Sequence, residues 1–222
     1  MSDGGLFQDH GYYGWVIAND ASIIWEGRGR VPGNHDQFDS LRSESSGFLH
    51  ALKVAYETLT AHDHAVTSAT LGSDSKVLID RVQQFQISQG RPPKMYVLPH
   101  MDIQCQIDRV LGKLNESISQ INVVHVKGHQ DTKKASRLSW LERLNVRADQ
   151  LATLERYHLE LKTFRSFHAC FPAAKIQLYL ANNLIHKYVP SEIHNAIMSD
   201  KYLSYLTYKF KWKNSTYKYT DW

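Results

Sequence analysis

The sequence predicts an α/β fold in which a mixed five-stranded sheet is flanked by helices. Three observations agree on this: β-rich runs open the chain, single strands and helices alternate after them, and apolar residues recur at helical spacing in the longer segments. An antiparallel start followed by alternation predicts three antiparallel strands and then two parallel ones. With 222 residues, 42% hydrophobic and 22% charged, the chain can form one good-sized core plus an appendage.

The elements are expected in the order β-β-β-α-β-α-α-β-α. The runs "YYGWVIA" and "SIIWEG" are rich in β-branched and aromatic residues, and the intervening "NDA" is a turn signal. From Leu41 to Leu59 the apolar positions follow a helical period, and Asp39 and Ser40 before them are suited to capping. The remaining expected elements are a strand over 66–73, helices over 74–86 and 101–114, a strand over 121–126, and a helix that opens on Asn145.

The pattern of residue types along the sequence changes after about residue 157. This change predicts a main domain over 1–157 and a C-terminal extension over 158–222. In the extension we expect a hairpin around an Asn-Asn turn and a helix with Pro190 in its first turn. In "YKFKW", strand alternation would place Tyr208, Phe210 and Trp212 on one face. Either these aromatic residues pack on the core, which we favour, or they stack on a nucleic-acid strand.

Composition excludes several classes of protein. No apolar run approaches the roughly 18 residues of a membrane span, and the start of the chain has no signal-peptide pattern. Cys105 and Cys170 show no metal-ligand spacing, so neither a disulfide framework nor a zinc site is indicated. We therefore expect an intracellular protein of the cytoplasm or nucleus, not secreted and without a membrane partner.

Positive charge gathers in two places. Residues 201–222 hold five lysines and one aspartate, and six basic residues but only two acids lie from Lys127 to Arg147. These patches are either solvated surface or a contact for a polyanion. In the second interpretation, Lys127, Lys133 and Lys134 are candidates for contact with the substrate.

Four carboxylates are the candidate site. Glu44 lies along the edge of the apolar stripe of its helix, and Leu41 three residues earlier rules out a capping box. Asp149 has no basic residue three or four positions away, whereas Asp3 could be a turn residue and Asp74 a helix N-cap. If the four converge, their mutual repulsion requires cations, and oxygen ligands select Mg²⁺ or Mn²⁺. Two such ions would suit phosphodiester hydrolysis.

Five segments, in order, resemble the type 1 ribonuclease H family. They are "SDGG" with the following "GWVI", "RSESSGFLHAL", "GSDSKVLI", "VKGHQD" and "LNVRADQLA". The likeness is greatest to ribonuclease H domains that follow a reverse transcriptase in retroelement polyproteins. It implies a ribonuclease H-like fold, cleavage of the RNA strand of RNA·DNA hybrids with two Mg²⁺ ions or Mn²⁺ as substitute, and a reverse transcriptase domain in the same polyprotein.

The resemblance also implies roles for individual residues. Asp3, Glu44, Asp74 and Asp149 match the metal-binding acids of the family, and His129 matches a histidine that assists proton transfer or product release. Asn145 matches an asparagine that contacts substrate, although a helix N-cap is its other interpretation.

Two departures from the family pattern define an alternative. Val146 stands where the family often has Glu, and only Met1 and Ser2 precede Asp3, whereas the family's first strand begins several residues earlier. The second departure predicts a first strand truncated within a longer polyprotein. The rival hypothesis is therefore a catalytically inactive domain that binds hybrid or braces a polymerase.

Overall fold

The structure is a computed structural model, and it describes most of the first 160 residues and three short pieces of the remainder. The described ranges are 1–8, 10–31, 38–62, 66–88, 99–128, 137–160, 178–180, 183–185 and 208–209. Within these ranges, no helix combines the length and the apolar character needed to cross a membrane.

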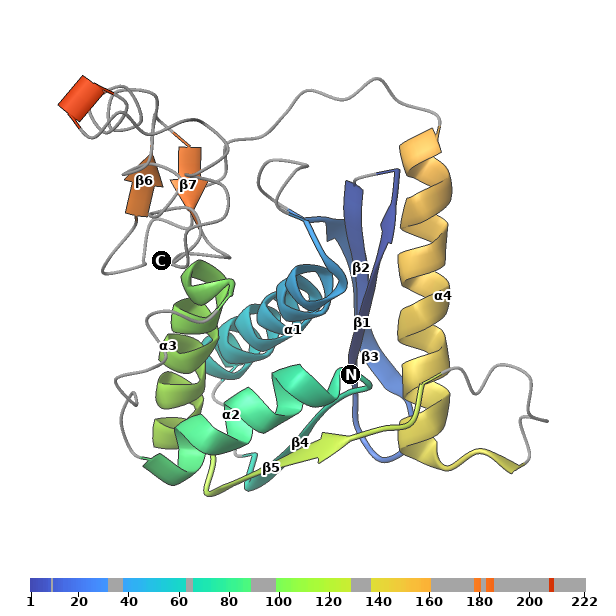
Figure 1. Cartoon of the computed structure of the whole chain (residues 1–222). Helices are drawn as coiled ribbons and strands as arrows, with labels where there is room; N and C mark the ends of the chain where they lie inside the picture. The colour runs from blue at the N-terminus through green and yellow to red at the C-terminus, as the bar shows by residue number, and fades with distance from the viewer. Residues whose placement is uncertain are drawn as a thin grey trace.

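A mixed five-stranded sheet forms the centre of the molecule, as predicted (Figure 1). Its spatial order is β3-β2-β1-β4-β5; β1, β2 and β3 pair antiparallel, whereas β4 pairs parallel with both β1 and β5. The strands are β1 (Ser2–Phe7), β2 (His10–Ala18), β3 (Ile23–Arg30), β4 (Ser68–Ser73) and β5 (Gln120–His125).

Helices cover both faces of this sheet. Helices α1, α2 and α3 lie on one side, and α4 crosses β1, β2 and β3 on the other (Figure 1). The helices are α1 (Ser40–His62), α2 (Lys76–Ser88), α3 (Met101–Ser117) and α4 (Trp140–Glu160). The predicted element order is confirmed over this part of the chain.

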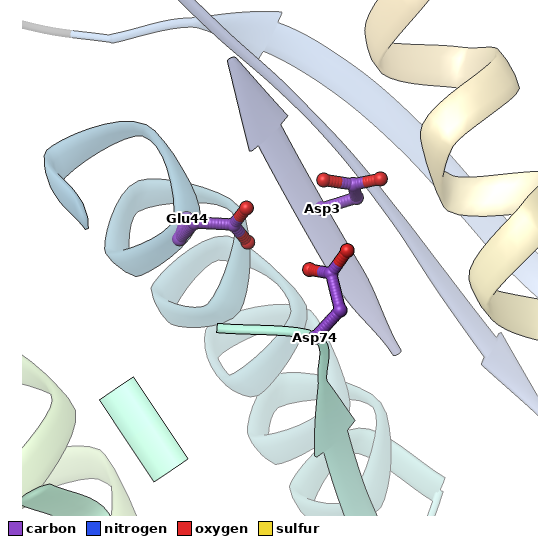
Figure 2. A group of neighbouring side chains, drawn as sticks. All are labelled: Asp3, Glu44 and Asp74. Atoms are coloured by element: carbon purple, nitrogen blue, oxygen red, sulfur yellow. The ribbon is translucent and has the colours of Figure 1, made fainter. Parts of the chain in front are cut away.

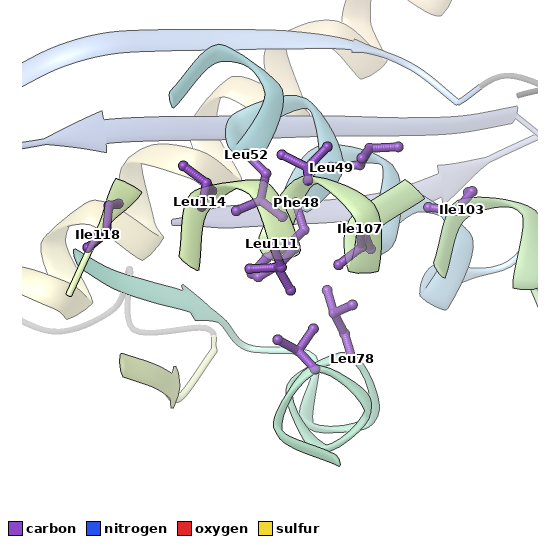
Figure 3. Close-up of a cluster of buried hydrophobic side chains, with 11 residues drawn as sticks. Phe48, Leu49, Leu52, Leu78, Ile103, Ile107, Leu111, Leu114 and Ile118 are labelled. Atoms are coloured by element: carbon purple, nitrogen blue, oxygen red, sulfur yellow. The ribbon is translucent and has the colours of Figure 1, made fainter. Parts of the chain in front are cut away.

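The two faces of the sheet carry apolar clusters of different size. Eleven buried residues from α1, α2, α3 and the segment after α3 form the larger cluster (Figure 3). The α4 side has a smaller cluster of four. There the helix lies close to the sheet, because a Cβ added to Gly14 would lie 2.3 Å from the carbonyl oxygen of Ala148. The larger cluster is Phe48, Leu49, Leu52, Leu78, Val82, Ile103, Ile107, Val110, Leu111, Leu114 and Ile118; the smaller is Val16, Leu144, Ala148 and Leu151.

The start of α1 is held by polar contacts. Asp39 caps the helix, since its Oδ1 accepts a 2.8 Å hydrogen bond from the Arg42 backbone N–H. Its other oxygen lies 2.7 Å from His100 Nε2. Arg42, fully buried, donates two hydrogen bonds of 3.0 and 2.9 Å to the Asp102 carboxylate. These contacts bind the first turn of α1 to the start of α3.

The helix that carries Asp149 begins at Trp140, so the expectation that it opens on Asn145 is wrong. A capping box starts it: the Glu142 backbone N–H donates to Ser139 Oγ at 3.3 Å, and Glu142 Oε2 accepts from the Ser139 backbone N–H at 2.8 Å. Asn145 therefore lies inside the helix and cannot be its N-cap.

The described pieces of the extension agree with one expectation and contradict another. The hairpin is confirmed, because β6 (Leu178–Leu180) pairs antiparallel with β7 (Asn183–Ile185). Tyr208 and Lys209 are helical, so strand alternation does not apply to them. Tyr208 is 79% exposed, and this aromatic ring is not packed on the core. Phe210, Trp212 and the helix expected behind Pro190 lie outside the described residues, and the division near residue 157 stays a prediction.

Candidate metal centre

Three of the predicted acids meet where the end of β4 lies beside the start of β1, although they come from three different elements. Asp3 lies on β1, Glu44 in the second turn of α1, and Asp74 directly after β4 (Figure 2). One carboxylate oxygen from each lies within 4.8 Å of the others. The convergence predicted for these three residues is confirmed.

The backbone explains why these side chains meet. β1 and β4 are paired at Ser2 and Ser73, and each aspartate follows one of these two residues. Glu44 is brought close because Gly4 has no side chain: a Cβ there would lie 2.5 Å from the backbone carbon of Ser43. Glycine at this position lets α1 lie directly against β1.

Hydrogen bonds orient two of the carboxylates. Asp3 Oδ1 accepts a 2.6 Å bond from the Gly4 backbone N–H, and Glu44 Oε2 accepts a 3.3 Å bond from Ser73 Oγ. Each of these two acids thus has one oxygen held by a donor of the protein, and the two carboxylates lie close together.

The pKa values of Asp3 and Glu44 show the effect of crowding. Burial, followed by the charges of Asp74 and Asp149, raises the pKa of Asp3 from 3.8 to about 7. Burial and the charges of Asp3 and Asp74 raise the pKa of Glu44 well above its ordinary value. Because like charges and desolvation both oppose ionisation, a bound cation would remove most of this unfavourable energy.

Asp149 lies beside this group. It is half-buried on α4, and its charge contributes to the raised pKa of Asp3. Among the described residues, however, the set within 4.8 Å consists of Asp3, Glu44 and Asp74. The structure thus brings Asp149 to the edge of the centre, and its role as a ligand stays a prediction.

Comparison with known proteins depends on structure, because no family model and no curated protein matches the chain. The solution structure of the PFV ribonuclease H domain aligns with a TM-score of 0.50 at 20% identity, covering 71% of this chain and 91% of that one. The chain has the ribonuclease H-like fold.

Two further structures with this fold align at lower TM-scores. Ribonuclease H1 of Halobacterium salinarum NRC-1 has a TM-score of 0.44 at 19% identity, covering 71% of this chain and 95% of that one. LC11-RNase H1 in complex with an RNA/DNA hybrid has a TM-score of 0.48 at 14% identity, with coverages of 72% and 96%.

The other predicted site residues differ in how far the structure describes them. Lys127 is exposed just after β5, whereas His129, Lys133 and Lys134 lie outside the described residues. Asn145 is only 2% exposed, and in the described part of the chain its Oδ1 has no hydrogen-bond partner.

Two residues at the centre were missed by sequence reasoning. Ser73 binds Glu44, and His125 Nε2 lies 3.0 Å from the carbonyl oxygen of Asp74. Ser73 could have been suspected, since it precedes Asp74 at the end of a predicted strand. For His125 no spacing rule applied, because its proximity depends on the pairing of β4 with β5.

The three carboxylates are suited to a divalent cation. Carboxylate oxygens are the hard ligands that Mg²⁺ and Mn²⁺ prefer, and three of them from separate elements can bind one side of an ion while water fills the other. The raised pKa values support the same interpretation, because the folded protein holds these acids together against their mutual repulsion. Asp3, Glu44 and Asp74 would hold the ion.

Proposed function

We propose that the protein is a metal-dependent endonuclease that hydrolyses the RNA strand of RNA·DNA hybrids. The observation that supports this most is the convergence of Asp3, Glu44 and Asp74 within 4.8 Å, where β4 ends beside β1 in a ribonuclease H-like sheet. We further propose that it acts as the ribonuclease H domain of a retroelement polyprotein that also contains a reverse transcriptase. The likeness of its motifs to such domains supports this context.

Each side chain at the centre has a task in this proposal. Asp3, Glu44 and Asp74 bind Mg²⁺, and Asp149 completes the acidic set from α4. When bound, two divalent ions neutralise the scissile phosphate, activate a water molecule and stabilise the leaving oxygen. The Gly4 N–H and the Ser73 hydroxyl hold two of the carboxylates in place.

The roles of the loop residues are also part of the proposal. Lys127 is exposed and lies between Val126 and Gly128, which contact Ser73 and Asp74, and it is suited to contact a phosphate of the hybrid together with Lys133 and Lys134. His129, by its match to the family motif, assists proton transfer or product release. Asn145 would reach the substrate only if its surroundings move, because it is buried.

A cleavage assay tests the proposal. An end-labelled RNA in an RNA·DNA hybrid is incubated with Mg²⁺ or Mn²⁺, beside an RNA·RNA duplex of the same sequence. We expect metal-dependent cutting of the hybrid's RNA alone. Asp74→Asn should reduce the rate by more than about 100-fold, because loss of an outer-shell partner of a metal already costs about 10- to 100-fold.

The matched control is Asp80→Asn, which removes an exposed aspartate from α2 and should leave cleavage unchanged. Equal loss in both variants would show that the effect of Asp74→Asn is not specific to the metal centre. Absence of cutting by folded wild-type protein would contradict the proposal.

The rival hypothesis was an inactive domain that binds hybrid or braces a polymerase. It depends on a first strand too short to position Asp3, but β1 is a formed strand in which Asp3 pairs with Gly14. Among the described residues no observation favours the rival. It would be supported if folded protein bound the hybrid tightly and cut it with neither metal.

A further inference from the structure

His125 lies at the end of β5, next to the candidate metal centre. Its register partner across the parallel pair is Ser73, the residue before Asp74. The ring is exposed, and its Nε2 lies 3.0 Å from the carbonyl oxygen of Asp74. Because a carbonyl oxygen can only accept, Nε2 must carry a hydrogen and donate it.

Asp74 occupies a short connection, which needs such support. β4 ends at Ser73 and α2 begins at Lys76, so Asp74 and Ser75 lie outside both elements. The segment after β5 contacts the backbone at two successive carbonyls: Val126 N–H donates to Ser73 at 3.0 Å, and His125 binds Asp74. The peptide units that determine where the Asp74 side chain starts are thereby held by one neighbouring segment.

Gly128, three residues further along the same segment, lies against the carboxylate itself. A Cβ added to Gly128 would lie 2.4 Å from Asp74 Oδ2, closer than real Cβ atoms approach an oxygen. Glycine is therefore required if the carboxylate is to keep its present position. The segment from His125 to Gly128 thus contacts both the backbone and the side chain of Asp74.

We propose that His125 and Gly128 are positioning residues that hold Asp74 in the orientation needed to bind the divalent cation. The inference rests on the proposed metal centre and goes beyond it, because neither residue is a ligand. His125 acts through the carbonyl of Asp74, and Gly128 acts by leaving room for the carboxylate. Their effect should therefore appear in metal affinity before any substrate is present.

Binding of Mn²⁺ to the full chain, measured by calorimetry or by electron paramagnetic resonance, tests this for His125. His125→Leu removes the donor and should weaken Mn²⁺ binding by about tenfold, the lower end of the range for outer-shell partners. His125→Gln keeps an N–H donor near the position of Nε2 and should bind within about threefold of wild type. Equal affinity of His125→Leu and wild type, or equal weakening in both variants, would overturn the role of His125.

A second pair of variants tests Gly128. Gly128→Ala should displace the Asp74 carboxylate and weaken Mn²⁺ binding at least as much as His125→Leu does. Its control is Gly112→Ala on α3, where an added Cβ has no atom within 4 Å, so Mn²⁺ binding should not change. Unchanged binding in Gly128→Ala would contradict the role of Gly128. If Gly128→Ala fails to fold, the proposal is decided by His125→Leu and His125→Gln, which change an exposed side chain.

The outcomes distinguish this inference from the proposed function. Wild type that binds Mn²⁺ with the expected pattern of variants but leaves the hybrid uncut would refute the nuclease and keep the positioning role. If wild type cuts the hybrid while His125→Leu and Gly128→Ala bind Mn²⁺ normally, the nuclease is supported and the positioning role is refuted. Wild type that binds no Mn²⁺ would overturn the inference.

Discussion

Two buried groups of charged side chains begin in the same part of α1, and they are built on opposite principles. Arg42 is fully buried, and its two hydrogen bonds join it to Asp102, a residue of opposite charge. Glu44, two residues later and 8% exposed, meets Asp3 and Asp74, which carry the same charge. Burial alone therefore does not mark a functional site, whereas burial among like charges does.

Folding by itself accounts for the first group. The ion pair satisfies both of its members, and together with the contact between Asp39 and His100 it joins the starts of α1 and α3. Burial lowers the pKa of His100, which favours its neutral form despite the neighbouring Asp39. In the acidic group, by contrast, burial and neighbouring carboxylates both raise the pKa values of Asp3 and Glu44. A bound cation would neutralise the like charges of this acidic group, which explains why the fold brings them together.

The largest effect is expected from breaking the balanced group. Arg42→Met leaves Asp102 buried without its partner and should lower the free energy of unfolding by about 3–5 kcal/mol. Urea denaturation followed by circular dichroism measures it. Adding Asp102→Leu should recover most of the loss, since a buried ion pair can be replaced by apolar residues. A loss below about 1 kcal/mol in Arg42→Met would show that the two groups do not differ as described.

The corresponding change in the acidic group should have the opposite sign. Asp3→Asn removes one of the repelling charges and should raise the free energy of unfolding by about 1–3 kcal/mol at pH 8 in EDTA. It should also abolish tight Mn²⁺ binding. Asp80→Asn, on an exposed face of α2, should change stability by less than about 0.5 kcal/mol and serves as the control. Destabilisation by Asp3→Asn would contradict the electrostatic interpretation.

Stability of the metal-free protein should fall as pH rises. Between its ordinary pKa of 3.8 and its folded pKa of about 7, Asp3 keeps a proton that the unfolded chain has released. The unfolded state then binds fewer protons, so the free energy of unfolding decreases, by up to about 1.4 kcal/mol per pH unit for this group. The raised pKa of Glu44 acts in the same direction. Denaturation in EDTA at pH 5, 6, 7 and 8 measures the slope, and saturating Mg²⁺ or Asp3→Asn should reduce it.

The smallest effect is expected at Ser73, which moderates the acidic group. Its hydroxyl donates to Glu44, which lowers the pKa of that carboxyl, and accepts from the Ser75 N–H. Ser73→Ala should reduce stability by about 1 kcal/mol and move Mn²⁺ binding to higher pH, because Glu44 would release its proton less readily. Thermal unfolding and Mn²⁺ titration across pH measure the two effects. An unchanged pH dependence of binding would show that Ser73 does not influence Glu44.

Local patterns predicted most of the fold. Alternation and helical periodicity are properties of neighbouring residues, and they correctly predicted the order of the elements and the antiparallel and parallel parts of the sheet. A local pattern also explains the one helix start that differs from expectation: Ser139 and Glu142 form a capping box, and the helix begins before Asn145. Ser139 and Glu142 satisfy each other's backbone N–H groups, whereas Asn145 Oδ1 accepts from no donor among the described residues, so the helix begins at Trp140.

Local sequence patterns specify the types of the elements and the acids that could form a site, because helix caps and apolar periods act over a few residues. The packing of distant segments brings Asp3, Glu44 and Asp74 together and leaves Asp149 at the edge. It also decided that Arg42 pairs with Asp102, 60 residues away, and that His125 supports Asp74, 51 residues away. Metal affinity and pKa values depend on which charges are brought together and kept from water, and strand pairing and helix packing over long sequence separations control both.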